Sequence, residues 1–156
     1  MNVYEKLKQL ELKIGVPIPP GGVFSPVRFF GGNLAYVSGT GPDSCGTTVW
    51  NGRVGAEYTV EQGRQAARAV ALNLVTCLHH ELGDLNRIKS FVKLLVFVNS
   101  SPDFCQQPQV ANGASQLLCD IFGEEVGLAA RSAIGVAVLP GNIAVEIEAL
   151  IELKDA

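Results

Sequence analysis

The segment from Ile88 to Val98 is apolar on both of its alternating faces, and this feature constrains the fold more than any other. If the segment is a strand, its large side chains divide between two faces: Val92, Leu94, Val96 and Val98 on one, and Phe91, Leu95 and Phe97 on the other. Successive side chains of a strand point to opposite faces, and these residue types favour a strand. We therefore expect a central strand that needs protein packed against each side.

Helices are predicted before and after this strand. A capping box at Thr59 begins a long helix that ends before Gly83, and a second helix runs from Pro108 to a closing Gly123. Apolar residues recur at helical spacing in both, and also at about residues 2–14, where we expect a short N-terminal helical extension.

Strands are predicted at both ends of this core. Residues 29–38 flank a glycine-rich turn at Gly31-Gly32-Asn33, and residues 131–149 form a second hairpin around Gly141-Asn142. The order hairpin, helix, strand, helix, hairpin predicts an α+β fold with both main helices on one face of the sheet. The other face would be a large apolar patch on a single chain, so another copy of the chain is expected to cover it. Residues 40–56 predict a loop, with a short strand near Val49 and Trp50.

Composition argues against several classes of function. The 156 residues fit a single domain, 1–156, and 12 basic against 15 acidic residues give a net charge of −3. The absence of a Lys/Arg cluster disfavours nucleic acid as a partner. The four cysteines have no metal-ligand spacing and His79-His80 lacks a third ligand, so we expect no metal. No apolar run reaches about 18 residues and the first residues are charged, which predicts a cytoplasmic protein with no membrane contact.

Charged residues within the last two predicted strands indicate where chemistry takes place. Arg131 begins one strand, and Glu146 and Glu148 lie inside the next. A charge among Ile, Val and Ala is costly unless it meets a partner, solvent or a ligand. A tight turn would place Glu146 opposite Val136, roughly 16 Å along the strand from Arg131 at about 3.3 Å per residue. A site that uses both side chains is therefore expected between neighbouring subunits.

Three segments resemble a known family. They are an Arg-Ser-x-x-x-Val-x-x-Leu-Pro strand at 131–140 followed by Glu-x-Glu at 146–148, a strand at 33–39 that ends in Ser-Gly, and a helix-to-strand passage at 83–98. Together they resemble the Rid/YjgF family of reactive-intermediate deaminases, historically described as endoribonuclease L-PSP, over roughly residues 17–153. The resemblance implies a chorismate-mutase-like mixed sheet with two main helices on one face, assembled as a homotrimer.

The resemblance also implies an activity and a site. The expected reaction is hydrolysis of small 2-imino acids or enamines to 2-keto acids and ammonia, as in a 2-iminobutanoate/2-iminopropanoate deaminase, with no cofactor. Arg131 would bind the substrate carboxylate through its fork of donors, and Glu146 would position the attacking water. The resemblance implies further substrate-binding positions at Phe24, Ser38, Gly39, Asn112 and Ala133. Phe24 and Ala133 stand where the family often has Tyr and Cys, so a hydroxyl and a thiol are missing.

Other interpretations of these residues stay open. Arg131 could pair with Glu124 or Glu125, Glu146 could belong to a solvated strand face, and Asn112 could be a surface residue. The alternative function is a non-catalytic trimeric stress or binding protein that holds small carboxylates in the same cleft, because Arg131 alone suffices for binding. A ribonuclease is disfavoured by the acidic balance.

Overall fold

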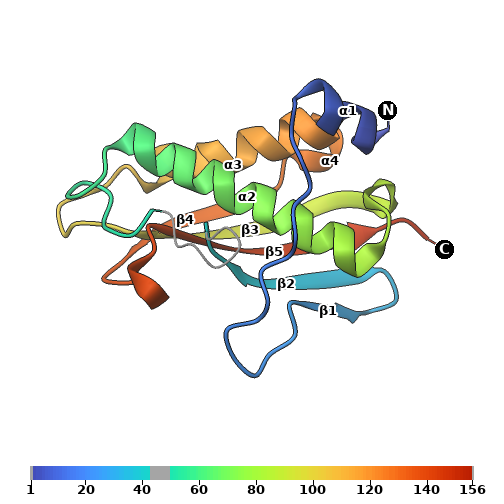
Figure 1. The fold of residues 1–156 in the computed structure, drawn as a ribbon, viewed down its shortest axis with the longest axis horizontal. Helices are drawn as coiled ribbons and strands as arrows, with labels where there is room; N and C mark the ends of the chain where they lie inside the picture. The colour runs from blue at the N-terminus through green and yellow to red at the C-terminus, as the bar shows by residue number, and fades with distance from the viewer. Residues whose placement is uncertain (1, 43–49, 156) are drawn as a thin grey trace.

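The chain folds into a five-stranded sheet with its helices on one face. The computed structural model describes residues 2–42 and 50–155. The elements are α1 (Val3–Gln9), β1 (Val27–Phe30), β2 (Leu34–Thr40), α2 (Val60–Leu82), β3 (Ile88–Asn99), α3 (Gln107–Phe122), α4 (Glu124–Gly127), β4 (Ala130–Val136) and β5 (Val145–Leu153), with 3-10 turns η1 (Leu85–Arg87) and η2 (Pro140–Asn142). In Figure 1, α2 and α3 lie across the same side of the sheet. The predicted α+β architecture is confirmed.

Local signals in the sequence account for both long helices. The Thr59 side chain accepts a hydrogen bond from the Gln62 N–H, the reciprocal bond completes the capping box, and Gly83 ends α2 in the left-handed conformation. Pro108 lies in the first turn of α3, and Gly123 follows its last residue. The N-terminal helix is shorter than predicted, since α1 ends at Gln9.

The central position of β3 agrees with its apolar sequence, but its face assignment needs one correction. The strand order is β1-β2-β5-β3-β4, so β3 has a neighbour on each side. Leu94, Val96 and Val98 are buried, whereas Leu95 and Phe97 are half-buried on the open face. A register shift between Phe91 and Lys93 changes the alternation there, so Phe91 packs against Phe122 of α3 while Val92 is exposed. The prediction that placed Phe91 with Leu95 and Phe97 is therefore wrong.

The predicted C-terminal hairpin is also wrong. Strands β4 and β5 lie on opposite sides of β3: β4 runs parallel to it and β5 antiparallel. Residues 137–144 contain η2 and carry the chain across the end of β3. Glu146 therefore lies beside Phe97 and not opposite Val136, as a tight turn would have placed it. The turn residues at 140–142 are present, but they do not determine which strands pair.

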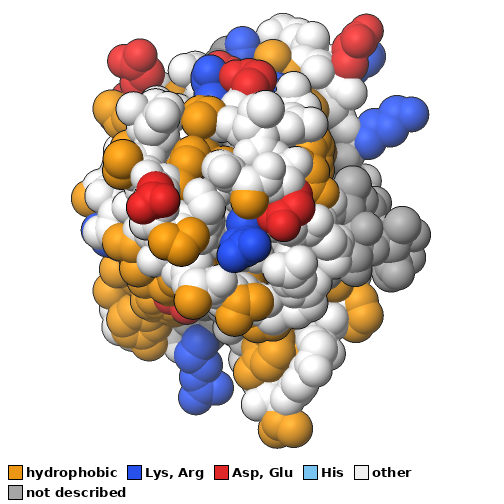
Figure 2. Space-filling view, turned by 90° about the vertical axis from the view of Figure 1, so that its left-hand side faces the viewer, with side chains coloured by type: hydrophobic (Ala, Val, Ile, Leu, Met, Phe, Trp, Pro, Cys, Tyr) orange, Lys and Arg blue, Asp and Glu red, His pale blue; other side chains and the backbone are white. Residues whose placement is uncertain are grey.

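Beyond the helix layer, the opposite face of the sheet keeps apolar side chains in solvent. Tyr36 and Ile134 are 42% and 44% exposed, and Ile134 is paired with Phe97 on the open face. Figure 2 shows the left-hand end of the view in Figure 1, where hydrophobic side chains lie at many places on the surface with charged ones between them. Val49 lies outside the described residues, and Trp50 belongs to none of the five strands. Among residues 2–42 and 50–155, the helices lack the combination of length and hydrophobicity that crossing a membrane requires.

Candidate functional site

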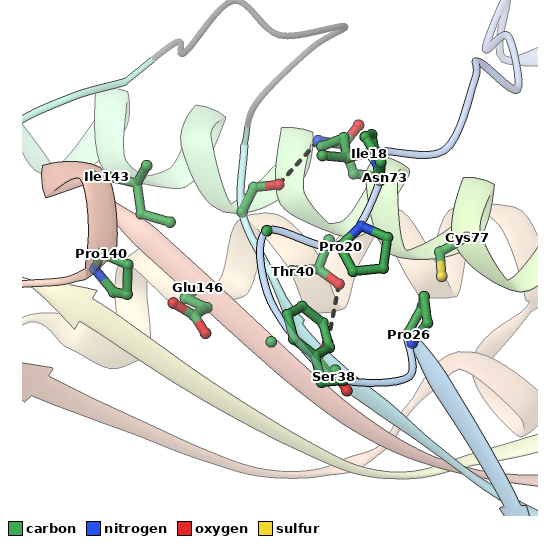
Figure 3. A pocket seen from close by; sticks show the side chains of 16 residues that line it. Ile18, Pro20, Pro26, Ser38, Thr40, Asn73, Cys77, Pro140, Ile143 and Glu146 are labelled. Carbon is green, nitrogen blue, oxygen red and sulfur yellow. Dashed lines mark hydrogen bonds between the residues drawn. The ribbon is translucent and has the colours of Figure 1, made fainter.

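A pocket of about 450 Å³ lies at the end of β2, and Glu146 of β5 points into it (Figure 3). Its other walls come from helix α2, from the η2 turn and from the segment between α1 and β1. Three predicted substrate-binding residues, Phe24, Ser38 and Gly39, line the same pocket. We call these three residues and Glu146 the pocket group. The structure thus brings together four residues from three distant parts of the sequence.

The carboxylate of Glu146 is half-buried, and the glycine at position 39 allows it to lie where it does. The Glu146 side chain occupies the place that a Cβ atom on residue 39 would need, so only glycine fits this close approach. Burial raises the pKa of Glu146, and the negative charge of Glu148 on the same face of β5 raises it further. The arrangement holds a carboxyl group that takes up a proton more readily than one in water.

The η2 wall of the pocket is fixed by Asn99, which the sequence analysis did not single out. Asn99 is fully buried at the end of β3, and its side-chain amide donates hydrogen bonds to Asn142 Oδ1 at 3.0 Å and to the Ile143 carbonyl at 3.1 Å. Its backbone N–H donates to the carbonyl of Ala144. The sequence does contain a signal for this residue, because a polar side chain follows directly after the apolar run of β3. Asn99 positions Pro140 and Ile143, which line the pocket.

Arg131 lies at the edge of the sheet, where α3 holds its guanidinium. Nη1 donates to Asn112 Oδ1 at 2.9 Å and to Ser115 Oγ at 3.0 Å, and Nη2 donates to the Pro108 carbonyl at 3.3 Å. Ser115 and the Pro108 carbonyl escaped the sequence analysis because nothing in their local pattern links them to Arg131. Burial lowers the pKa of Arg131, although a guanidinium keeps its charge in proteins.

The guanidinium of Arg131 retains capacity for a ligand. An arginine side chain has five N–H donors, and the three bonds to α3 leave two without a partner among the described residues. None of the described carboxylates forms an ion pair with it, so the alternative pairing with Glu124 or Glu125 is not observed in the single chain. Asn112 is exposed, but its side chain accepts the hydrogen bond from Arg131, so it is more than a solvated surface residue.

Arg131 and Glu146 point to opposite faces of the sheet. Arg131 pairs with Leu94 of β3 and Glu146 pairs with Phe97. Laterally paired residues share a face, and residues three apart along a strand face opposite ways. Ala133 lies two residues after Arg131 on β4, paired with the buried Val96. Arg131, Asn112 and Ala133 therefore form a second cluster, the edge group, which the chain keeps apart from the pocket group.

The described residues offer no ready-made metal site. Among residues 2–42 and 50–155, no three His, Cys, Asp or Glu side chains are grouped so that they could hold a metal ion. His79 and His80 lie in the last turn of α2, where His79 Nδ1 is hydrogen-bonded to the Tyr4 hydroxyl and His80 Nε2 to the Gly15 carbonyl. Both histidines thus fasten the N-terminal segment to α2.

Nearly the whole chain is similar to known proteins. A family described as "YjgF/chorismate mutase-like, putative endoribonuclease" matches residues 11–153. Protein TCP17 of Trypanosoma cruzi is 46% identical over 154 residues, which cover 99% of this chain and 96% of TCP17.

Two crystal structures share nearly all of the fold. The protein Atu1372 of unknown function from Agrobacterium tumefaciens is 37% identical with a TM-score of 0.89, and the alignment covers 97% of this chain and 92% of that one. A "putative endoribonuclease" from Shewanella oneidensis is 29% identical with a TM-score of 0.93, covering 98% and 100%. A third structure, the Rid family protein YyfA of Yersinia pestis, is 22% identical and superposes with a TM-score of 0.60. The alignment covers 90% of this chain and 95% of YyfA, and it shows that the two share the fold.

Proposed function

The chain belongs to the YjgF/chorismate mutase-like family, and we propose that it hydrolyses small 2-imino acids, or their enamine tautomers, to 2-keto acids and ammonia. Family membership supports a small-molecule deaminase or a related role. The observation that carries the specific reaction is the half-buried Glu146 carboxylate, with a raised pKa, at the wall of a pocket of about 450 Å³. A base whose pKa lies closer to the working pH transfers protons more effectively.

In this proposal Arg131 binds the carboxylate of the substrate. Its two uncommitted donors face a ligand while Asn112, Ser115 and the Pro108 carbonyl hold the guanidinium plane in place. A carboxylate accepts charge-assisted hydrogen bonds from such a fork, and binding in this way orients the imine carbon. Asn112 and Ser115 act as positioning residues.

Glu146 then activates water. The carboxylate accepts a proton as the water oxygen bonds to the imine carbon, which gives a carbinolamine. Return of that proton to the nitrogen makes ammonia the leaving group. As the C–N bond breaks, the Glu146 carboxylate takes the proton of the hydroxyl group, so that the keto group forms, and it then passes this proton to the departing ammonia or to water. Backbone groups near Ala133 contact the nitrogen, since β4 is the last strand of the sheet and its outer edge is unpaired within it. A protonated imine is already electrophilic, so positioning supplies most of the acceleration.

The two groups meet only if two copies of the chain assemble. We propose that the edge group of one protomer faces the pocket group of its neighbour in a homotrimer, with Phe24, Ser38 and Gly39 forming the wall around the bound substrate. The opposite orientations of Arg131 and Glu146 support this arrangement, and so do the exposed apolar side chains of the open face.

Cleavage of RNA fits this pocket less well. Glu146 is the only charged residue among the described residues that line it, and the Arg131 that a neighbour would contribute only balances that charge, so the assembled site offers no cluster of positive charge for a phosphate backbone. The net charge of −3 gives no general attraction for a polyanion.

An assay with imines generated by an amino-acid oxidase tests the proposal. Keto-acid release should be faster in the presence of the protein, and Arg131→Ala should abolish the acceleration. Glu146→Gln should lower kcat by about 100-fold, the usual contribution of a general base, while binding of the 2-keto acid persists. A wild-type protein that binds keto acids without accelerating hydrolysis would instead identify the non-catalytic carboxylate-binding function.

A further inference from the structure

We infer that the end of the pocket farthest from Glu146 is a compartment for the substrate side chain, and that it selects branched aliphatic and aromatic 2-imino acids over the alanine-derived imine. This inference rests on the proposed function and names the substrate class for the same site. We call this end the distal compartment; its residues are Ile18, Pro20, Pro26, Thr40, Asn73 and Cys77.

The pocket has two separate ends. In Figure 3, Glu146, Pro140 and Ile143 lie at one end, and Ile18, Asn73 and Cys77 lie at the other, with Thr40 and Pro20 on the side of the distal compartment that is nearer to Glu146. In the proposed complex the imine carbon lies beside Glu146 and the carboxylate is bound by Arg131 of the neighbouring protomer. The substituent that remains for the distal compartment is therefore the substrate side chain.

Polar groups of the distal compartment already have partners. Thr40 Oγ1 donates to the Ser38 carbonyl at 3.1 Å, and Asn73 Nδ2 donates to the Gly41 carbonyl at 2.9 Å. Burial raises the pKa of the Cys77 thiol to about 11, so the thiol is neutral at physiological pH. With Ile18, Pro20 and Pro26 as further walls, and no charged residue among the described residues of the compartment, a charged side chain would lose its hydration there without gaining an ion pair.

The wall formed by Ile18 and Pro20 is held in advance of ligand binding. The Tyr4 hydroxyl is bonded to His79 Nδ1 at 3.1 Å and accepts the Leu85 N–H at 3.0 Å, while His80 Nε2 is bonded to the Gly15 carbonyl at 3.2 Å. These contacts anchor both ends of the stretch that precedes the pocket, and proline restricts the backbone of the wall itself. Helix α1, which lies before the part of the chain that matches the family, thus contributes to the shape of the pocket.

The expected preference follows from buried surface. Each additional buried methylene strengthens binding by about fourfold, so a leucine-derived side chain should exceed a methyl group by about tenfold to a hundredfold in kcat/KM. The experiment measures kcat/KM of the wild-type protein for imines generated from alanine, leucine and phenylalanine.

Cys77→Met tests the compartment directly. The longer side chain fills the space beside Asn73, so the ratio of kcat/KM for the leucine-derived imine to that for the alanine-derived imine should fall by about tenfold. Cys119→Met is the matched control, because it makes the same change at another half-buried helical cysteine, in α3 and outside the pocket, and it should leave the ratio unchanged.

The outcomes separate the inference from the proposed function. Turnover that favours the alanine-derived imine, or a ratio that Cys77→Met does not change, overturns the inference while the deaminase function stands. If the wild-type protein hydrolyses no imine, calorimetry measures its affinity for pyruvate and for 4-methyl-2-oxopentanoate, and the comparison tests the distal compartment without turnover. Tighter binding of the larger acid that is lost in Cys77→Met supports the distal compartment, and absent or size-independent binding overturns it.

Discussion

At the scale of single residues, the proposed mechanism depends on a carboxylate whose ionisation is less favourable than in water. Glu146 is half-buried on β5, and both its burial and the charge of Glu148 raise its pKa. The rate should therefore fall as the pH drops through that pKa, since a protonated carboxyl group cannot accept a proton from water.

Replacing Glu148 tests the electrostatic part of this account. Glu148→Gln removes a neighbouring negative charge, so it should lower the pKa of Glu146 and move the acid limb of the kcat profile to lower pH. The control is Glu152→Gln on the same face of β5, where the carboxylate pairs with Lys89 at 2.9 Å. A limb that stays in place, or moves to higher pH, would contradict the assignment of Glu146 as the base.

Gly39 provides a second test at this scale. The Cβ atom of Gly39→Ala would occupy the space of the Glu146 carboxylate, which can swing away because it ends a flexible side chain. We expect kcat to fall by about tenfold or more while the thermal midpoint changes little, since a misplaced catalytic group costs rate before it costs stability. Gly15→Ala, where no atom lies near the new methyl group, should keep full activity. Equal activity of both variants would argue against a catalytic role for the observed position of Glu146.

The sequence drew attention to Arg131 and Glu146 because a charge in an apolar strand is costly without a partner, and the family resemblance supplied the roles expected of them. It could not reveal Ser115 or the Pro108 carbonyl, which contact Arg131 across 16 and 23 positions of the chain. The sequence also could not show that Cys77 lines the pocket, since a helical pattern does not distinguish a half-buried side chain that meets a pocket from one that does not.

At the scale of elements, the features encoded locally were predictable and the strand pairing was not. The capping box at Thr59, Pro108 at the start of α3 and the glycine after each long helix all act within a few residues of their own position. Strand β3 accepts a neighbour on either side, and the apolar pattern of residues 130–136 fits both positions. The turn residues within 137–144 predicted a hairpin. The connection is long enough to cross the end of β3 instead, so β4 and β5 lie on opposite sides of β3 and the hairpin does not form.

Gly113 allows the close packing of α3 against α2, and α3 carries the residues that hold Arg131. A Cβ atom on Gly113 of α3 would collide with the backbone carbonyl of Arg64 in α2, which has no flexible end to move. Gly→Ala in an open helix position stabilises by about 1 kcal/mol, but here we expect about 2 kcal/mol of destabilisation from overpacking. Denaturant unfolding of Gly113→Ala measures whether the free energy of unfolding rises or falls relative to the wild-type protein. A stabilised variant would contradict the close helix contact that places Asn112 and Ser115 beside Arg131.

At the scale of the whole molecule, the proposed function gives each chain two half-sites that it cannot join by itself. Glu146 of the pocket group and Arg131 of the edge group point to opposite faces of the sheet, and the open face carries exposed apolar side chains. The low charged fraction of 17% agrees with a surface that is partly covered. From the sequence, a site between subunits was expected because of the distance from Arg131 to Glu146 along a hairpin. That hairpin does not form, and the support for a shared site is instead the opposite orientation of the two side chains.

Complementation between inactive variants tests this central claim most directly. Arg131→Ala and Glu146→Gln are co-expressed in equal amounts, and the mixed assemblies are purified and assayed for imine hydrolysis. If each site takes Arg131 from one protomer and Glu146 from its neighbour, random assembly restores about a quarter of the wild-type activity, because each half-site is intact in half of the protomers. Glu146→Gln co-expressed with Gly39→Ala, both in the pocket group, should restore nothing beyond the residual activities. Mixed assemblies that stay as inactive as the separate variants would contradict a site shared between protomers.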